Sequence, residues 1–134
     1  MLPFEFRIKG PPVSSQTRNR QRLQYWKQQV ALAAEAALNR AHPCNCEVRL
    51  TITYYYEGAS PDVDNIIKPI QDALIGCVYL DDDQVADTRS RKRSLDGSYK
   101  LRGASPTLVL GFADGDDFLH ILIEEHVESQ DLNQ

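Results

Sequence analysis

The chain has 134 residues, which is the length of a single domain. Hydrophobic residues make up 42% of the sequence and charged residues 25%, a globular composition that excludes wholesale disorder. Apolar runs are shorter than the ~18 residues of a membrane span, and charge follows the first residues too soon for a signal peptide. We therefore expect one cytoplasmic domain over residues 1–134, with no membrane partner.

Charge is distributed unevenly along the chain. The formal net charge is −4, which taken alone argues against a nucleic-acid partner. Twelve of the 19 acidic residues and all 15 Lys and Arg residues precede Asp114, so residues 1–113 carry a formal charge of +3. Because local patches set the field that a phosphate backbone meets, the clustered bases leave DNA binding open, and an acidic tail begins at about residue 124. The alternative is that the charges only solvate two faces of an acidic protein.

The three cysteines Cys44, Cys46 and Cys77 form an odd set without the Cys-x-x-Cys spacing of common metal or redox motifs. This pattern predicts neither a disulfide framework nor a zinc site. It favours a reducing cytoplasm as the setting.

The first half of the chain predicts a strand, a helix and a second strand. Apolar and charged residues alternate over residues 4–9, which indicates a strand that Pro11 ends. Apolar residues recur at three- and four-residue spacing over residues 18–40, which predicts a long amphipathic helix. The clearest alternation covers residues 46–56 and predicts a strand.

The second half predicts a shorter helix and three more strands. A helix is expected at about residues 64–75, with an irregular start because of Pro69 and an end at Gly76. Asp96 and Gly97 indicate a turn, and strands are expected at the ranges 84–93, 107–112 and 118–123. The last of these segments is also compatible with a helix. The pattern predicts an α+β fold with two main helices packed on one mixed β-sheet.

Acidic residues gather in two clusters. Asp62 and Asp64 flank one residue at the start of the predicted second helix, and the cluster Asp81–Asp83 follows that helix. Alternate side chains of an extended segment point the same way, and a helix of about twelve residues lets the chain return beside its start. Crowded carboxylates repel each other unless a cation lies among them, and oxygen ligands suit Mg²⁺. The alternative is that these acids serve only as helix caps and turns.

Three blocks of sequence around these acids resemble the RusA family of Holliday-junction resolvases. They are Pro61–Lys68, Asp72–Leu74 and Val78–Val85, and they match the family pattern P-D-x-D-N-x-x-K, D-A-L and D-D-x-Q-[VI] in order and spacing. The resemblance implies a Mg²⁺-dependent endonuclease that acts as a homodimer on four-way DNA junctions. It also implies a cytoplasmic protein encoded by a bacterium or a prophage.

The resemblance assigns roles to individual residues. Asp62, Asp64 and Asp82 would bind the metal ion, and Lys68 would be the catalytic cation. Asp82 is chosen because the catalytic acid of the family stands two residues before the Gln, which is Gln84 in this chain. Asp81 would be a helper.

Basic residues before the long helix and along the predicted strand 84–93 would hold backbone phosphates, a contact that positions DNA without reading bases. These residues are Arg18, Arg20, Arg22, Arg89, Arg91, Lys92 and Arg93.

The predicted function is therefore a Mg²⁺-dependent, structure-selective endodeoxyribonuclease that resolves Holliday junctions in recombination and repair. The alternatives are a branched-DNA-binding protein without catalysis and a Mg²⁺ nuclease of flaps or single strands. For the homodimer, the first strand and the helix that carries Trp26 are expected to supply an apolar contact.

Overall fold

The computed structural model describes residues 2–39, 42–59, 61–96 and 103–127. It confirms an α+β architecture with one mixed sheet. The elements are β1 (Phe4–Lys9), α1 (Arg20–Leu38), β2 (Val48–Tyr56), the 3₁₀ turn η1 (Asp64–Ile66), α2 (Ile67–Ala73), the 3₁₀ turn η2 (Asp82–Gln84), β3 (Val85–Ser94), α3 (Pro106–Asp114) and β4 (Phe118–Glu125). Among the described residues, no helix combines the length and the hydropathy that crossing a membrane requires.

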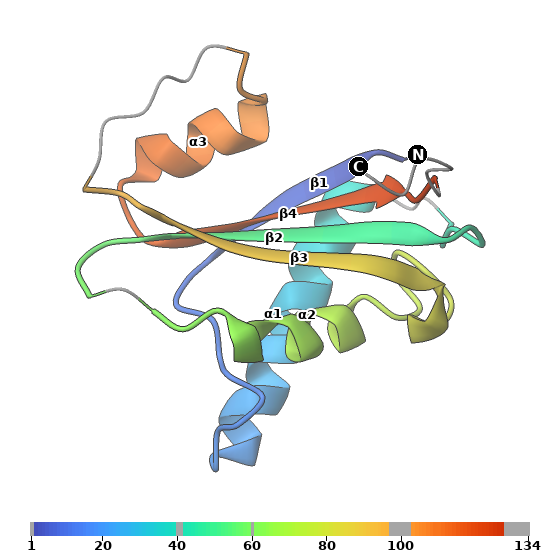
Figure 1. Cartoon of the computed structure of the whole chain (residues 1–134), viewed down its shortest axis with the longest axis horizontal. Helices are drawn as coiled ribbons and strands as arrows, with labels where there is room; N and C mark the ends of the chain where they lie inside the picture. The colour runs from blue at the N-terminus through green and yellow to red at the C-terminus, as the bar shows by residue number, and fades with distance from the viewer. Residues whose placement is uncertain (1, 40–41, 60, 97–102, 128–134) are drawn as a thin grey trace, which may run out of the picture.

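The sheet has the strand order β1-β4-β2-β3 (Figure 1). β4 pairs antiparallel with both β1 and β2, whereas β3 runs parallel to β2. A parallel pair needs a crossover connection, and the segment with η1, α2 and η2 supplies it. The two acidic clusters, Asp62 with Asp64 and Asp81–Asp83, lie at the two ends of this crossover.

Both faces of β2 are covered. Leu50, Ile52 and Tyr54 belong to the main core, together with buried residues of α1 and α2. On the opposite face, Tyr55 stacks on Phe118, with ring centroids 4.7 Å apart. Figure 1 shows α1 and α2 along one side of the sheet and α3 on the other.

Helix α1 confirms the long helix predicted from the periodicity. Asn19 caps its start by accepting a hydrogen bond from the Arg22 backbone N–H at 3.0 Å, which satisfies one of the free donors of the first turn. Trp26 lies in the core and is only 6% exposed. This side chain therefore serves the fold, and the apolar contact expected from the helix in a dimer stays a prediction.

The segment predicted as a strand at residues 107–112 is wrong, because it forms helix α3. The Ser105 hydroxyl accepts a hydrogen bond from the Leu108 N–H at 3.2 Å, and Pro106 occupies the first turn. Gly115 ends the helix at a φ of 76°. Proline at the start and glycine after the end are strong helix signals, and they outweigh the β propensity of the apolar residues between them. The described chain thus has three α-helices, where two main helices were predicted.

Aromatic packing fixes α3 against the sheet. The ring of Phe112 lies edge-on to Tyr55 and Phe118, with centroids 5.0 and 5.6 Å away. Gly111 is buried, and a Cβ atom at this position would lie 2.5 Å from the Phe118 ring. The helix approaches the sheet this closely because Gly111 has no side chain.

The predicted second helix and the strand after it are confirmed with shifted bounds. The helix begins as η1 and continues as α2, with Pro69 buried near its start. It ends at Ala73, before Gly76. The exposed strand is β3, and the segment 118–123 is confirmed as part of strand β4.

The cysteine prediction is wrong in one respect, since Cys44 and Cys46 form a disulfide. Their Cα atoms are 5.6 Å apart, within the range that a disulfide spans. The Cys46 N–H donates a hydrogen bond to the Cys44 sulfur at 3.1 Å. The two residues therefore lie on one tight bend of the chain. Cys77 is a free cysteine.

Parts of the sequence prediction lie outside the described residues. They are Gly97 of the predicted turn and residues 128–134 of the acidic tail. Glu124 of that tail is described, and it belongs to β4, where it pairs with Arg49 at 2.9 Å.

Candidate active site

The loop that carries Asp62 and Asp64 is fastened through its main-chain carbonyls. The Lys92 ammonium donates to the Pro61 carbonyl at 3.1 Å, and the Ser90 hydroxyl donates to the Val63 carbonyl at 2.9 Å. From the other side, the Ser15 N–H donates to the Asn65 carbonyl at 2.8 Å.

These hydrogen bonds use the carbonyls of every second residue and leave the aspartates between them exposed. Asp62 and Asp64 are both exposed, whereas Val63 is half-buried against the core. The loop therefore presents two carboxylates to solvent from a main chain held at three points.

Lys68 lies one helical turn beyond Asp64 and reaches the second acidic cluster. Its ammonium is 3.0 Å from a carboxylate oxygen of Asp72 and 3.4 Å from one of Asp82. Asp72 is also 3.8 Å from the ammonium of Lys27 on α1. The structure thus brings Lys68 and Asp82 together, as the sequence predicted, and it adds Asp72 as an anchor.

Electrostatics stabilise the charged forms of this pair. The hydrogen bond with Asp72 and the charge of Asp72 raise the pKa of Lys68, with a smaller contribution from Asp82. Hydrogen bonding with the Asp81 side chain and the nearby Lys68 ammonium lower the pKa of Asp82. Lys68 is therefore a cation and Asp82 an anion at neutral pH.

The donor set suits a hard divalent cation in its chemistry, because Asp62, Asp64 and Asp82 all offer carboxylate oxygens. Over the described part of the chain, no three His, Cys, Asp or Glu side chains already converge on one point. Mg²⁺ retains several waters and binds through one or two carboxylates plus substrate phosphates, so it does not require a closed protein cage. The residues therefore fit a metal ion that substrate helps to hold.

Basic residues occur in both segments whose hydrogen bonds hold the acidic loop. Arg18, Arg20 and Arg22 are exposed at the start of α1, three to seven residues after Ser15, which bonds to the acidic loop. On the other side, Lys92 of β3 bonds to that loop directly. Phosphates on either side of the acidic loop would meet positive charge.

The arginines of β3 lie on the opposite face of the sheet from Lys92. Arg89, Arg91 and Arg93 are paired with Thr51, Thr53 and Tyr55 of β2, which face α3. The Arg91 guanidinium donates to the Thr53 hydroxyl at 3.2 and 3.0 Å. These arginines are exposed at the edge of the sheet, so DNA that touches both them and the acidic loop has to pass along that edge.

Comparison with known proteins decides the family. The model of the family described as endodeoxyribonuclease RusA matches residues 6–102 of the chain. The chain belongs to this family. The match begins within β1 and includes α1, β2, the crossover and β3, so it covers the acidic loop, Lys68 and Asp82. Comparison with curated proteins gave no match.

Membership of the RusA family makes this chain a member of a family of DNA endonucleases.

Two features of the site were not assigned from the sequence. One is Lys27, which pairs with Asp72 in addition to Lys68. The other is the side chain of Gln84, which in the motif served only to locate Asp82. The spacing of Asp81 and Gln84 is that of a capping box, and this signal predicts that Gln84 folds back on the acidic turn.

Proposed function

We propose that this RusA-family protein is a Mg²⁺-dependent endonuclease that resolves four-way DNA junctions as a homodimer. The observation that carries the proposal is the exposed pair Asp62 and Asp64 on a fastened loop, one helical turn from the ion pair of Lys68 and Asp82. Recombination and repair, and a cytoplasmic setting in a bacterium or its prophage, are part of the same proposal.

The chain's own residues would divide the work as follows. Asp62, Asp64 and Asp82 would hold the metal ion, which when bound activates water and polarises the scissile phosphodiester. The side chain of Lys68, whose ammonium is anchored on Asp72, remains 58% exposed. It is therefore free to contact a phosphate oxygen and stabilise the negative charge that develops on it.

The basic residues would position the DNA. Arg18, Arg20 and Arg22 lie on one side of the acidic loop, and β3 lies on the other. Contacts of this kind go to phosphates and set the register of the duplex without reading bases. A structure-selective enzyme needs this type of contact, because it recognises the shape of branched DNA.

A panel of cleavage substrates tests the proposal. End-labelled four-way junction, 5′ flap and linear duplex of the same arm sequences are incubated with the protein and Mg²⁺. We expect paired incisions in the junction and little cleavage of the other two. Preferred cutting of the flap would favour the flap nuclease, and tight junction binding without any incision would favour the non-catalytic DNA-binding protein.

A further inference from the structure

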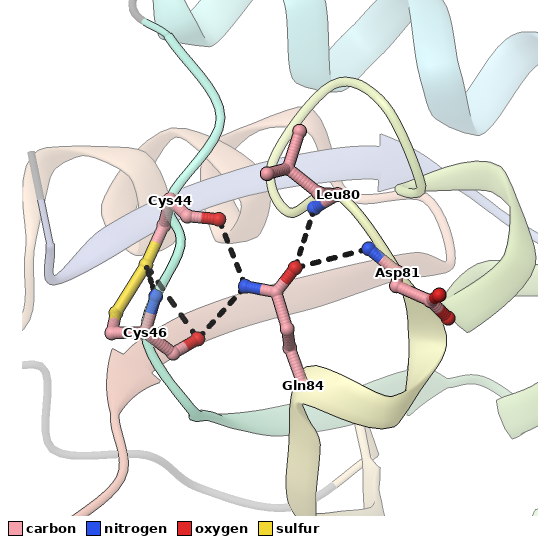
Figure 2. Close-up of a disulfide and its surroundings, with 5 residues drawn as sticks. All are labelled: Cys44, Cys46, Leu80, Asp81 and Gln84. Atoms are coloured by element: carbon pink, nitrogen blue, oxygen red, sulfur yellow. Dashed lines mark hydrogen bonds between the residues drawn. A yellow bond between two sulfur atoms is a disulfide. The ribbon is translucent and has the colours of Figure 1, made fainter.

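The side chain of Gln84 uses its whole hydrogen-bonding capacity on two separate segments (Figure 2). Its carbonyl oxygen accepts from the Leu80 N–H at 2.8 Å and from the Asp81 N–H at 3.0 Å. Its amide nitrogen donates to the Cys44 carbonyl at 2.8 Å and to the Cys46 carbonyl at 2.9 Å. Two acceptor sites and two donors are all that a glutamine amide offers.

The partners determine which way the amide points. Main-chain N–H groups only donate and main-chain carbonyls only accept. A flipped amide would therefore place donors against donors and acceptors against acceptors on both sides. Each of the four bonds therefore supports the same orientation.

The two segments that Gln84 joins have different anchors. Leu80 and Asp81 immediately precede Asp82, and the Asp81 carboxylate accepts from the Asp83 N–H at 3.3 Å. Cys44 and Cys46 are joined by a disulfide just before β2 begins, and the Cys44 N–H also donates to the Val78 carbonyl at 2.8 Å. Gln84 thus fastens the acidic turn to a cross-linked loop at the edge of the core.

We infer that Gln84 is a positioning residue of the proposed nuclease: its side chain holds the turn Asp81–Asp83 so that Asp82 faces Lys68. The inference rests on the proposed function for its effect on turnover. Burial does not hold this turn in place, since η2 contains no buried residue. Without the amide, two main-chain N–H groups and two carbonyls would be left without these hydrogen bonds, and the turn would no longer be tied to the loop.

The test replaces Gln84 with methionine, which has similar length and cannot form these bonds, and compares it with Gln28→Met on an exposed face of α1. Amide hydrogen exchange is measured first. In Gln84→Met we expect the Leu80 and Asp81 amides to exchange at least tenfold faster, while the amides of β2 and β4 keep their rates. Gln28→Met should behave as wild type.

Turnover and binding are then measured on four-way junction. We expect kcat to fall by about tenfold to a hundredfold, the scale for a small misplacement of a catalytic group, with the junction Kd in the absence of divalent ions within twofold of wild type. A second variant, Gln84→Ala, removes the same four hydrogen bonds without adding bulk or charge. It should give a similar fall in kcat, and it serves if the methionine variant does not fold.

The outcomes separate the inference from the proposed function. Unchanged exchange at Leu80 and Asp81, or faster exchange with unchanged kcat, would overturn the positioning role. A wild-type protein that cleaves no junction would overturn the proposed function. The exchange measurement would then still decide whether Gln84 holds the turn.

Discussion

At the scale of single residues, the candidate site is a set of exposed charges whose positions are fixed by hydrogen bonds and ion pairs to neighbouring groups. Carbonyl hydrogen bonds hold the main chain around Asp62 and Asp64. Asp72 holds Lys68, and Gln84 holds the turn that carries Asp82. The exposed groups are thus preorganised without being buried, which leaves them accessible to a bulky substrate.

The role of Lys68 is open to direct test. Lys68→Ala should lower turnover on bound junction by about two to three orders of magnitude, which is the usual cost of removing one electrostatic stabiliser. Lys9→Ala serves as a control, because Lys9 is exposed and paired only with Asp116 at 3.7 Å in the described structure. Single-turnover cleavage with saturating enzyme measures the effect. A change confined to Kd would instead make Lys68 a contact that positions DNA.

At the scale of elements, α3 shows how a helix substitutes for a predicted strand. The helix has a serine cap, a proline in its first turn and a terminal glycine, and it packs its aromatic residue on the rings of the sheet. Its function in the fold is to cover the face of β2 that α1 and α2 leave open. At Gly111 the helix lies too close to the Phe118 ring for a side chain to fit.

We expect Gly111→Ala to destabilise the fold by about 1–3 kcal/mol, the usual range for overpacking a core. The added methyl group would enter the Phe118 ring, which is itself held between Tyr55 and Phe112. Urea unfolding measures the loss, with Ala113→Ser at an exposed position of the same helix as the control. Equal stability of Gly111→Ala and wild type would show that α3 does not pack closely on the sheet.

Strand β3 carries the second prediction at this scale. If Arg91 and Arg93 bind phosphates, replacing both with Ala should flatten the dependence of log affinity on log salt. The slope should fall by about 0.9 for each phosphate of duplex DNA that the protein no longer neutralises. Junction binding measured between about 50 and 200 mM salt gives the slope. An unchanged slope would leave these arginines as surface charge on the α3 side of the sheet.

At the scale of the whole molecule, the sequence predicted the α+β architecture, with one helix taken for a strand. Period-two and helical patterns identified β1, α1 and β2, because burial imposes those periods. The segment of β4 suited a helix as well as a strand. The crossover between β2 and β3 brings Lys68 and Asp82 together, although they are 14 residues apart in the sequence. The sequence could not predict α3 from its apolar residues alone, since they also suit a strand.

Local and long-range contacts explain the other differences. Cys44 and Cys46 are separated by two positions and pair within one loop, without a spacing typical of disulfide motifs. The hydrogen bonds of Gln84 join two segments that meet only in the folded chain. Helix α1 buries Trp26 in the core, and the dimer contact expected from β1 and this helix stays a prediction. Strand β1 remains available as an edge of the sheet.

We expect the protein to form a two-fold dimer. A four-way junction is cut at two symmetry-related points, one chain carries one acidic site, and closed two-fold pairing is the commonest assembly of soluble proteins. Analytical ultracentrifugation at micromolar concentration should give twice the mass of the 15.2 kDa chain. A strict monomer, both free and bound to junction, would remove the basis for paired incision.

The central claim is that Asp62, Asp64 and Asp82 act together in metal-dependent cleavage. The most direct measurement compares wild type with Asp64→Asn and Asp82→Asn on a labelled four-way junction, with Mg²⁺ for cleavage and without it for binding. Our account predicts that both variants lose cleavage and bind the junction at least as well as wild type, because removing negative charge does not weaken attraction to phosphate. Cleavage at the wild-type rate by both variants would contradict it.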